Sequence, residues 1–159
     1  MDTTTVNKAR NIAMRALNYT TRSKSDLISR LEKADIETAV IELVIDELEA
    51  NGLINDSAMA KRWVEDRADR KLYGSQRLEK EMLQHGLSAE DVEVALSLVK
   101  PEEELARAVT VMSKKWTREQ MQQLDGPAKL AELRRCASFL TRRGFPYTIV
   151  RDAMALLKT

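Results

Sequence analysis

The chain has 159 residues, with 26 Lys and Arg against 25 Asp and Glu, and 43% of its residues are hydrophobic, which suits one domain or several small modules. Five glycines, three prolines and 4% aromatic residues are too few for an all-β or loop-rich protein, and helix formers dominate, so we expect an all-α fold. The single Cys136 excludes an internal disulfide, and no apolar run approaches the roughly 20 residues of a membrane-spanning helix. We therefore expect a cytoplasmic protein that makes no contact with a membrane.

Capping signals and apolar periodicity predict the helices in chain order. Ser23, Ser88 and Thr117 resemble N-caps, each with a suitable partner three residues later. The prolines at positions 101, 127 and 146 stand where a helix can begin, and the glycines fall between apolar runs. The expected helices are residues 6–20, 24–34, 37–50, 56–72, 75–85, 89–99, 102–116, 127–143 and 147–157, with a short extra turn at 118–124.

The segment "NGLINDSAMAKRW" ends one helix and begins another within a few residues. We expect Gly52 to end the first helix in a left-handed conformation. Leu53 and Ile54 should then be covered at the seam, and Asn55 or Asp56 should cap the following helix. This segment therefore predicts a boundary between two modules.

An internal repeat is visible when residues 27–45 are moved along the chain by 51 and then by a further 58 positions. The aligned apolar sets are Leu27, Leu78 and Cys136; Leu31, Met82 and Leu140; Ile36, Leu87 and Phe145; Ile41, Val92 and Val150; and Ile45, Leu96 and Met154. Asp35, Gly86 and Gly144 share a break inside this pattern. The alignment predicts three tandem three-helix modules, residues 1–54, 55–100 and 101–159.

Modules of about 50 residues have cores that are marginal alone, so neighbouring modules should pack on one another. We expect an elongated, slightly curved row of modules, an architecture suited to an extended partner.

The sequence contains no constellation of residues typical of catalysis. One histidine and one cysteine cannot form the usual four-ligand zinc site, and no phosphate-binding loop is present. Acidic residues alternate with Lys and Arg, as on solvated helix faces. We therefore expect no enzymatic activity, no metal and no cofactor. Cys136 should be buried on an apolar helix face, and Trp63 and Trp116 should anchor cores.

Two basic segments are candidates for binding a partner or DNA. The first, in "KRWVEDRADRK", contains Lys61, Arg62, Arg67, Arg70 and Lys71. The alternative for this segment is a solvent-exposed face that pairs with itself, because Asp66 lies four residues from both Arg62 and Arg70.

The second basic segment, "AELRRCASFLTRRG", contains Arg134, Arg135, Arg142 and Arg143, with only Glu132 nearby to neutralise them. It lies in residues 101–159, which carry 11 Lys and Arg against 7 Asp and Glu. These arginines are candidates for contact with a partner or with phosphates. The alternative is that the late arginines stabilise the negative end of their own helix.

The chain resembles the RecX family of bacterial regulatory proteins over essentially its whole length. The second module carries the most specific motif residues: Gly52, Leu53, Asp56, Ala60, Val64, Arg67, Gly74, Arg77, Leu78, Glu81, Met82, Gly86 and Leu87. The first module is similar at Leu17, Arg22, Ser23, Asp26, Leu27 and Leu31, and the third contains "FLTRRGF". Thr20 stands where the family often has an arginine, so no role of that arginine is carried over.

The resemblance implies tandem three-helix repeats that have no enzymatic activity of their own. Members bind RecA filaments on DNA and lie in the helical groove, and contact with DNA itself is also implied. They dampen ATP hydrolysis, strand exchange and the co-protease activity that triggers the SOS response in DNA repair. The expected partners are thus the RecA filament and DNA, and the protein is expected to be a monomer.

A direct DNA-binding regulator of the helix-turn-helix type is the alternative, because modules of three short helices can contain that motif. The net charge of +1 argues against it, as does the acidic and apolar segment "SAEDVEVALSLVK" in the third helix of the second module.

Overall fold

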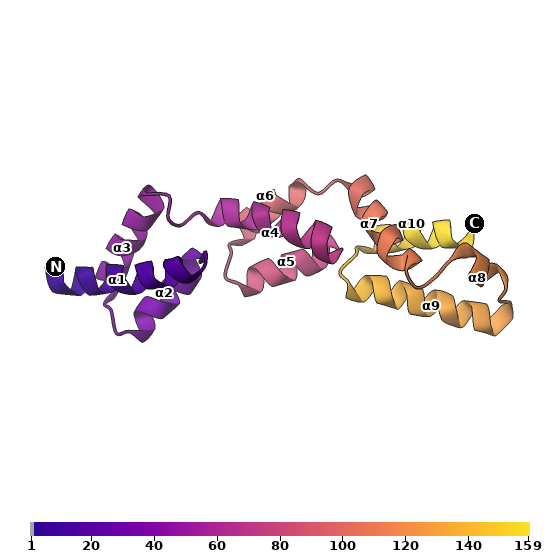
Figure 1. Ribbon diagram of the computed structural model, residues 1–159, viewed down its shortest axis with the longest axis horizontal. Coiled ribbons are helices and arrows are strands. Elements are labelled where there is room, and N and C mark those ends of the chain that lie inside the picture. The colour runs from indigo at the N-terminus through magenta and orange to yellow at the C-terminus, as the bar shows by residue number, and fades with distance from the viewer. Residues whose placement is uncertain (1) are drawn as a thin grey trace. The chain divides into compact units, whose positions relative to one another are not determined.

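The computed structural model describes residues 2–159, and within this range it contains helices and no strands (Figure 1). The all-α expectation is confirmed, and every expected helix is present with ends within three residues of the prediction. No helix in this range is long and apolar enough to cross a membrane. The helices are α1 (Thr3–Tyr19), α2 (Lys24–Lys33), α3 (Thr38–Ala50), α4 (Asp56–Lys71), α5 (Ser75–Gln84), α6 (Ala89–Ser97), α7 (Pro101–Ser113), α8 (Arg118–Gln122), α9 (Gly126–Arg142) and α10 (Tyr147–Lys158).

The predicted caps form as the sequence indicates. Ser23 Oγ accepts a hydrogen bond from the Asp26 amide at 3.1 Å, which satisfies one of the free amides at the start of α2. Thr117 and Gln120 form a complete capping box at the start of α8. These local bonds explain why the helix starts are readable from the sequence.

Pro146 lies just outside its helix, which begins at Tyr147 as predicted. It is the N-cap of α10, with φ −60° and ψ 156°, whereas Pro101 begins α7 as expected. An N-cap needs extended backbone, and the fixed φ of proline allows that conformation. Pro146 therefore precedes α10 as its N-cap.

The segment between α3 and α4 is largely as predicted. Gly52 has a left-handed φ of 72°, and Ile54 is buried in the core formed by α1–α3. Asn55 caps α4, since its Oδ1 accepts a hydrogen bond from the Ala58 amide at 3.0 Å. The prediction that Leu53 is covered is wrong, because it is 46% exposed. Neighbouring side chains outside a helix point in different directions, and only Ile54 faces the core.

The break shared by the three repeats is a left-handed residue. Asp35, Gly86 and Gly144 have φ values of 60°, 82° and 91°. Glycine adopts this conformation without strain, and aspartate is among the few other residues that visit it. The aligned apolar positions around it are buried, apart from the half-buried Leu96. The repeat found by alignment therefore has a conformational cause.

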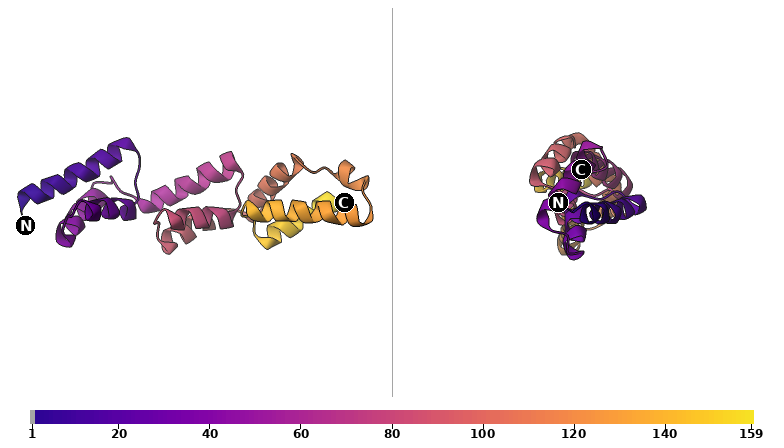
Figure 2. Two further views of the ribbon diagram at one scale, coloured as in Figure 1. Left: turned by 90° about the horizontal axis from the view of Figure 1, so that it is seen from below. Right: turned by 90° about the vertical axis from the view of Figure 1, so that its left-hand side faces the viewer.

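The packing divides the chain into two compact units. The N-terminal unit comprises Met1–Ala60 and Met82–Val92, and the C-terminal unit comprises Lys61–Glu81 and Glu93–Thr159. In the N-terminal unit α1, α2 and α3 pack against one another, and in the C-terminal unit α10 packs against α7, α8 and α9 (Figures 1 and 2). The division passes through α4, α5 and α6, and the three-module boundaries stay a prediction.

The C-terminal unit has a core built from α7 to α10. Cys136 is fully buried in it, and burial raises the pKa of its thiol to about 11. Trp116 is half-buried against this core, with its ring centroid 5.4 Å from that of Phe139. The predicted structural roles of Cys136 and Trp116 are therefore confirmed.

Candidate partner-binding surface

The first basic segment lies on α4. Lys61, Arg62, Arg70 and Lys71 are exposed to solvent. In the part of the chain that the structure describes, no ion pair joins Asp66 to Arg62 or to Arg70, so the expected self-paired face does not form. These four cations are therefore available to a partner.

Arg67, in contrast, is held within the C-terminal unit. Its guanidinium lies 4.8 Å from the centre of the Trp63 ring, and Nη1 donates to Glu81 Oε2 at 3.4 Å. Glu81 also accepts from the Trp63 indole nitrogen at 3.3 Å and from Arg77 Nε at 3.4 Å. One largely covered carboxylate on α5 thus gathers three donors, two of them from α4, and Arg67 serves the packing of α4 on α5.

The second basic segment lies on α9. Arg134 and Arg142 are exposed, and Arg135 Nη1 bonds the predicted neighbour Glu132 at 2.6 Å. The Arg135 side chain still exposes 73% of its surface, so this pair contributes little to stability. Arg143 is half-buried and reaches away from its own helix.

The two basic segments meet through Arg143. Its Nη2 donates to the Lys71 carbonyl, and its Nε donates to the Leu72 carbonyl at 3.4 Å. The last carbonyls of a helix lack intrahelical partners, so Arg143 caps the end of α4. The predicted alternative of an arginine at a helix C-terminus therefore applies, but the helix that Arg143 caps is α4.

Backbone contacts hold the same place together. The Gly74 amide donates to the Arg143 carbonyl, and the Gln76 amide donates to the Gly144 carbonyl, both at 2.9 Å. The Ser75 amide donates to Oε1 of the buried Glu104 on α7 at 2.8 Å. We call this contact of residues 71–77 with Glu104 and residues 143–144 the C-terminal joint.

The glycines of the C-terminal joint are required by the close approach of two backbone segments. A Cβ on Gly74 would lie 2.3 Å from the carbonyl carbon and oxygen of Gly144. A Cβ on Gly144 would lie 2.4 Å from the Arg77 amide nitrogen. No side chain fits either position without moving the backbone, so both glycines are explained by packing.

An aromatic ring contacts two of the cations at this joint. The guanidinium of Arg77 lies 3.7 Å from the centre of the Tyr73 ring, and that of Arg143 lies 5.2 Å from it. Such stacking holds arginine side chains in place. We call Arg70, Lys71, Arg77, Arg142 and Arg143 the joint cations. Sequence reasoning did not select Arg77 as a site residue, and its spacing after Tyr73 and Gly74 was the available signal.

The nine predicted site residues do not form one site. Lys71 and Arg143 are in contact, and Arg70 and Arg142 are their sequence neighbours. Lys61 and Arg62 precede Arg70 by eight or nine residues, which is about 12 to 14 Å along a helix. Arg134 and Arg135 are similarly remote from Arg142 along α9. The structure therefore gathers four of the nine at the C-terminal ends of α4 and α9 and leaves the other five apart, with Arg67 among them.

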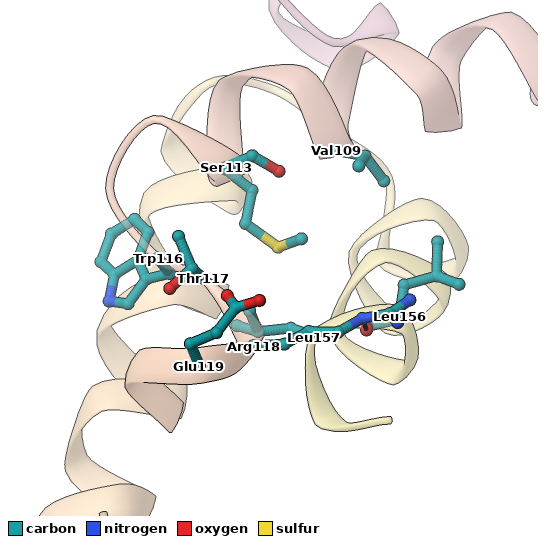
Figure 3. A pocket seen from close by; sticks show the side chains of 9 residues that line it. Val109, Ser113, Trp116, Thr117, Arg118, Glu119, Leu156 and Leu157 are labelled. Carbon is teal, nitrogen blue, oxygen red and sulfur yellow. Dashed lines mark hydrogen bonds between the residues drawn. The ribbon is translucent and has the colours of Figure 1, made fainter. Parts of the chain in front are cut away.

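A separate pocket in the C-terminal unit lies between α7, α8 and α10 and has a volume of about 370 Å³ (Figure 3). It is lined by Val109, Met112, Ser113, Trp116, Thr117, Arg118, Glu119, Leu156 and Leu157. Arg118 Nε donates to the Leu156 carbonyl at 2.9 Å, so this arginine is used to cap the end of α10. The described residues contain no group of three or more His, Cys, Asp or Glu that could hold a metal ion.

Comparison with known families gives two matches, which fall in the first and second predicted modules. Residues 9–48 match the family model described as "RecX, first three-helix domain", and residues 55–96 match "RecX, second three-helix domain". The chain is 35% identical over 145 residues to the regulatory protein RecX of Corynebacterium efficiens, covering 91% of this chain and 69% of that protein. It is 32% identical over 153 residues to the regulatory protein RecX of Streptomyces coelicolor, covering 94% and 79%.

Solved structures share the fold. The crystal structure of RecX from Lactobacillus salivarius superimposes with a TM-score of 0.85 and 22% identity, over 96% of each chain. A second structure, of a regulatory protein RecX, gives a TM-score of 0.78 over 95% of this chain and 73% of that one. The sequence matches over most of the chain, together with this fold, show that the chain belongs to the RecX family of regulatory proteins.

Proposed function

We propose that this protein binds RecA filaments on DNA in the cytoplasm and dampens RecA activity without catalysing a reaction itself. The affected activities are ATP hydrolysis, strand exchange and the co-protease function that triggers the SOS response, so the protein acts in DNA repair. The observation that carries the proposal is membership of the RecX family along nearly the whole chain.

The repeat supports this function physically. Tandem modules at residues 1–54, 55–100 and 101–159 offer several contacts to a partner that itself repeats, and a monomer suffices for this. Linked weak contacts raise the overall affinity, because each later contact forms at a high effective concentration. A repeated helical protein is therefore a suitable ligand for a filament.

The joint cations are the best candidates for one of these contacts. The Arg143 guanidinium is held by the Lys71 carbonyl, and Arg77 is held on Tyr73. Positioned cations lose little conformational freedom when they meet an acidic protein surface or a phosphate. Binding through them should weaken as the salt concentration rises.

Inhibition of DNA-dependent ATP hydrolysis by RecA tests the function. The wild-type protein should lower the ATPase rate at stoichiometric or lower amounts, and no effect at stoichiometric amounts would refute the proposal. The variant Arg70→Glu, Lys71→Glu, Arg142→Glu reverses three exposed joint cations and should need at least about tenfold more protein for the same effect. The control Lys80→Glu, Lys100→Glu, Lys158→Glu makes an equal charge change on other exposed positions and should inhibit normally.

The same two variants also test the alternative function, in which the protein acts by binding DNA directly. If the protein binds duplex DNA tightly without RecA, with a salt dependence worth several phosphates, the helix-turn-helix hypothesis is favoured. If the joint-cation variant loses inhibition while both variants bind DNA equally weakly, the contact is with the RecA protein.

A further inference from the structure

A shallow hollow in the N-terminal unit lies between α1 and α2 and includes none of the joint cations. It has a volume of about 370 Å³ and is lined by Ile12, Arg15, Ala16, Arg30 and Lys33. Ligand pockets range from about 300 to about 1,000 Å³, so this one has room for one or two side chains. The two helices that supply the lining pack directly on each other.

Cations surround the hollow and no carboxylate lines it. Arg15 comes from α1, whereas Arg30 and Lys33 come from α2. Arg30 shares its charge with Asp26, whose Oδ2 lies 2.9 Å from Arg30 Nε. Among the described residues, neither Arg15 nor Lys33 forms an ion pair. The hollow therefore has a positive potential that the protein leaves largely unbalanced.

Helix stability explains only part of this arrangement. Arg30 and Lys33 occupy the last turn of α2, where cations favour the helix dipole. Arg15 lies before the last turn of α1, which contains no basic residue, so the dipole does not account for it. Its convergence with the α2 cations from a second helix suits the recognition of a negatively charged group.

The floor of the hollow is aliphatic, formed by Ile12 and Ala16. Tyr19 follows on the same helical face, at spacings of three and four residues from Ala16 and Arg15, and is 89% exposed. A phosphate chain would neutralise the cations but would leave the floor uncovered. Bases prefer to stack on aromatic rings, and no ring lines the hollow.

We propose that this hollow is a docking site for an acidic peptide segment of a protein partner. The segment places one aliphatic side chain on Ile12 and Ala16 and its carboxylates beside Arg15, Arg30 and Lys33. Burial of the aliphatic side chain stabilises the complex, and the cations select acidic neighbours of that side chain. The site shares no residue with the joint cations, so it stands independently of the proposed action on RecA.

Fluorescence anisotropy with three labelled probes tests this site on the intact 159-residue chain. The first probe is a ten-residue peptide of Asp and Glu around a central Leu, the second has Ser in place of that Leu, and the third is a single-stranded oligothymidylate. We expect the Leu probe to bind the wild-type protein more tightly than the Ser probe. The variant Arg15→Glu, Lys33→Glu should weaken the Leu probe by at least about tenfold.

A matched variant and a second substitution keep the result interpretable. Lys80→Glu, Lys158→Glu makes the same charge change on other exposed positions and should bind the Leu probe within about twofold of wild type. Ile12→Ser should reduce the preference for the Leu probe over the Ser probe, while binding of both probes should still weaken as the salt concentration rises. Thermal unfolding checks that each variant is folded.

Three outcomes would overturn the proposal. The wild-type protein binds no acidic peptide, or it binds the Leu and Ser probes equally, or the Arg15 and Lys33 substitutions weaken the oligothymidylate and not the peptide. The last outcome would assign the hollow to nucleic acid. None of these results bears on the RecA ATPase measurement, so failure of this site and failure of the proposed function are distinguishable.

Discussion

The two units contain equivalent joints, and their comparison shows which part of the repeat is structural. In the N-terminal unit the Lys24 amide donates to Asp56 Oδ1 at 3.0 Å, as the Ser75 amide donates to Glu104 in the C-terminal unit. Lys24 and Ser75 are 51 residues apart, which is the repeat shift. In each case a carboxylate from a later helix caps the start of an earlier one, so this cap belongs to the shared frame.

The joints differ in the groups that close them. In the N-terminal joint Ser23 Oγ donates to the His85 carbonyl at 3.1 Å, and a Cβ on Gly86 would lie 2.6 Å from the Ser25 side chain. In the C-terminal joint Gly74 replaces the serine, and two backbone hydrogen bonds replace the side-chain bond. Arg143 stands where the N-terminal joint has His85. The C-terminal joint is therefore closed by backbone contacts and is cationic, whereas the cap is common to both joints.

Gly74→Ala should have the largest effect, because its Cβ would overlap the backbone of Gly144. We expect a loss of about 3 kcal/mol in the free energy of unfolding, at the upper end for overpacking. Gly52→Ala is the control, since nothing lies within 4 Å of its Cβ and only the left-handed φ is strained, at about 1 to 2 kcal/mol. Urea unfolding measures both, and equal losses would contradict the tight contact.

Removing the carboxylate caps should lower the free energy of unfolding by less than Gly74→Ala does. The loss should differ between the two joints. Glu104→Ala leaves the Ser75 amide without a partner in a buried place, at about 1 to 3 kcal/mol. Asp56→Ala should cost about 1 kcal/mol, because Asp56 is only half-buried and water can replace it. Amide hydrogen exchange of Ser75 and Lys24 would show each local opening. A larger loss of stability from Asp56→Ala than from Glu104→Ala would contradict the prediction that the cap of the C-terminal joint contributes more.

Asp56→Asn should change the free energy of unfolding little, but it should change how that free energy depends on pH. Burial raises the pKa of Asp56, aided by Asp91 and Glu49 and opposed by the hydrogen bond from the Lys24 amide. A carboxyl with a raised pKa binds its proton more tightly in the folded state, so stability falls as pH rises from 3.8 through the folded pKa. The asparagine oxygen still accepts the bond but does not titrate. The variant should therefore become more stable relative to wild type as the pH rises across this interval. Thermal unfolding measures this difference.

The smallest effect concerns the ion pair of Arg10 with Glu47, which joins α1 to α3. Its two hydrogen bonds are 2.8 and 2.7 Å, and the bond from Arg10 lowers the pKa of Glu47. A lowered pKa contributes stability above the ordinary value of 4.5 that is lost as pH falls through the folded pKa. Glu47→Gln should remove this slope from the N-terminal unit, and an unchanged slope would mean that the pair is inactive in solution.

The sequence predicted the helices because their starts and ends depend on nearby residues. Ser23, Asn55 and Thr117 bond amides within three positions, and left-handed residues mark the repeat. Asp56 was different: it was a candidate cap for its own helix, whereas it caps α2 from 32 positions away. Local sequence patterns cannot identify such a distant partner, because a carboxylate at that position looks the same in the sequence whichever helix it caps.

The candidate surface was predicted only in part, because some of its contacts also join residues far apart in the sequence. Both basic segments were recognised, but charge alone does not show that Arg143 crosses to Lys71 or that Arg67 is held by Trp63 and Glu81. Neither contact follows from spacing within one helix. The three-dimensional structure was needed to separate exposed cations from those that serve packing.

The long sequence separation of the joint contacts has a consequence for synthesis on the ribosome. Ser23 lies 62 residues before its partner His85, so at roughly 5 to 20 residues per second the start of α2 waits about 3 to 12 s for it. The start of α5 similarly waits for residues 143 and 144, which are made well after it. Nascent chains therefore carry an open joint at their growing end until the following repeat has emerged.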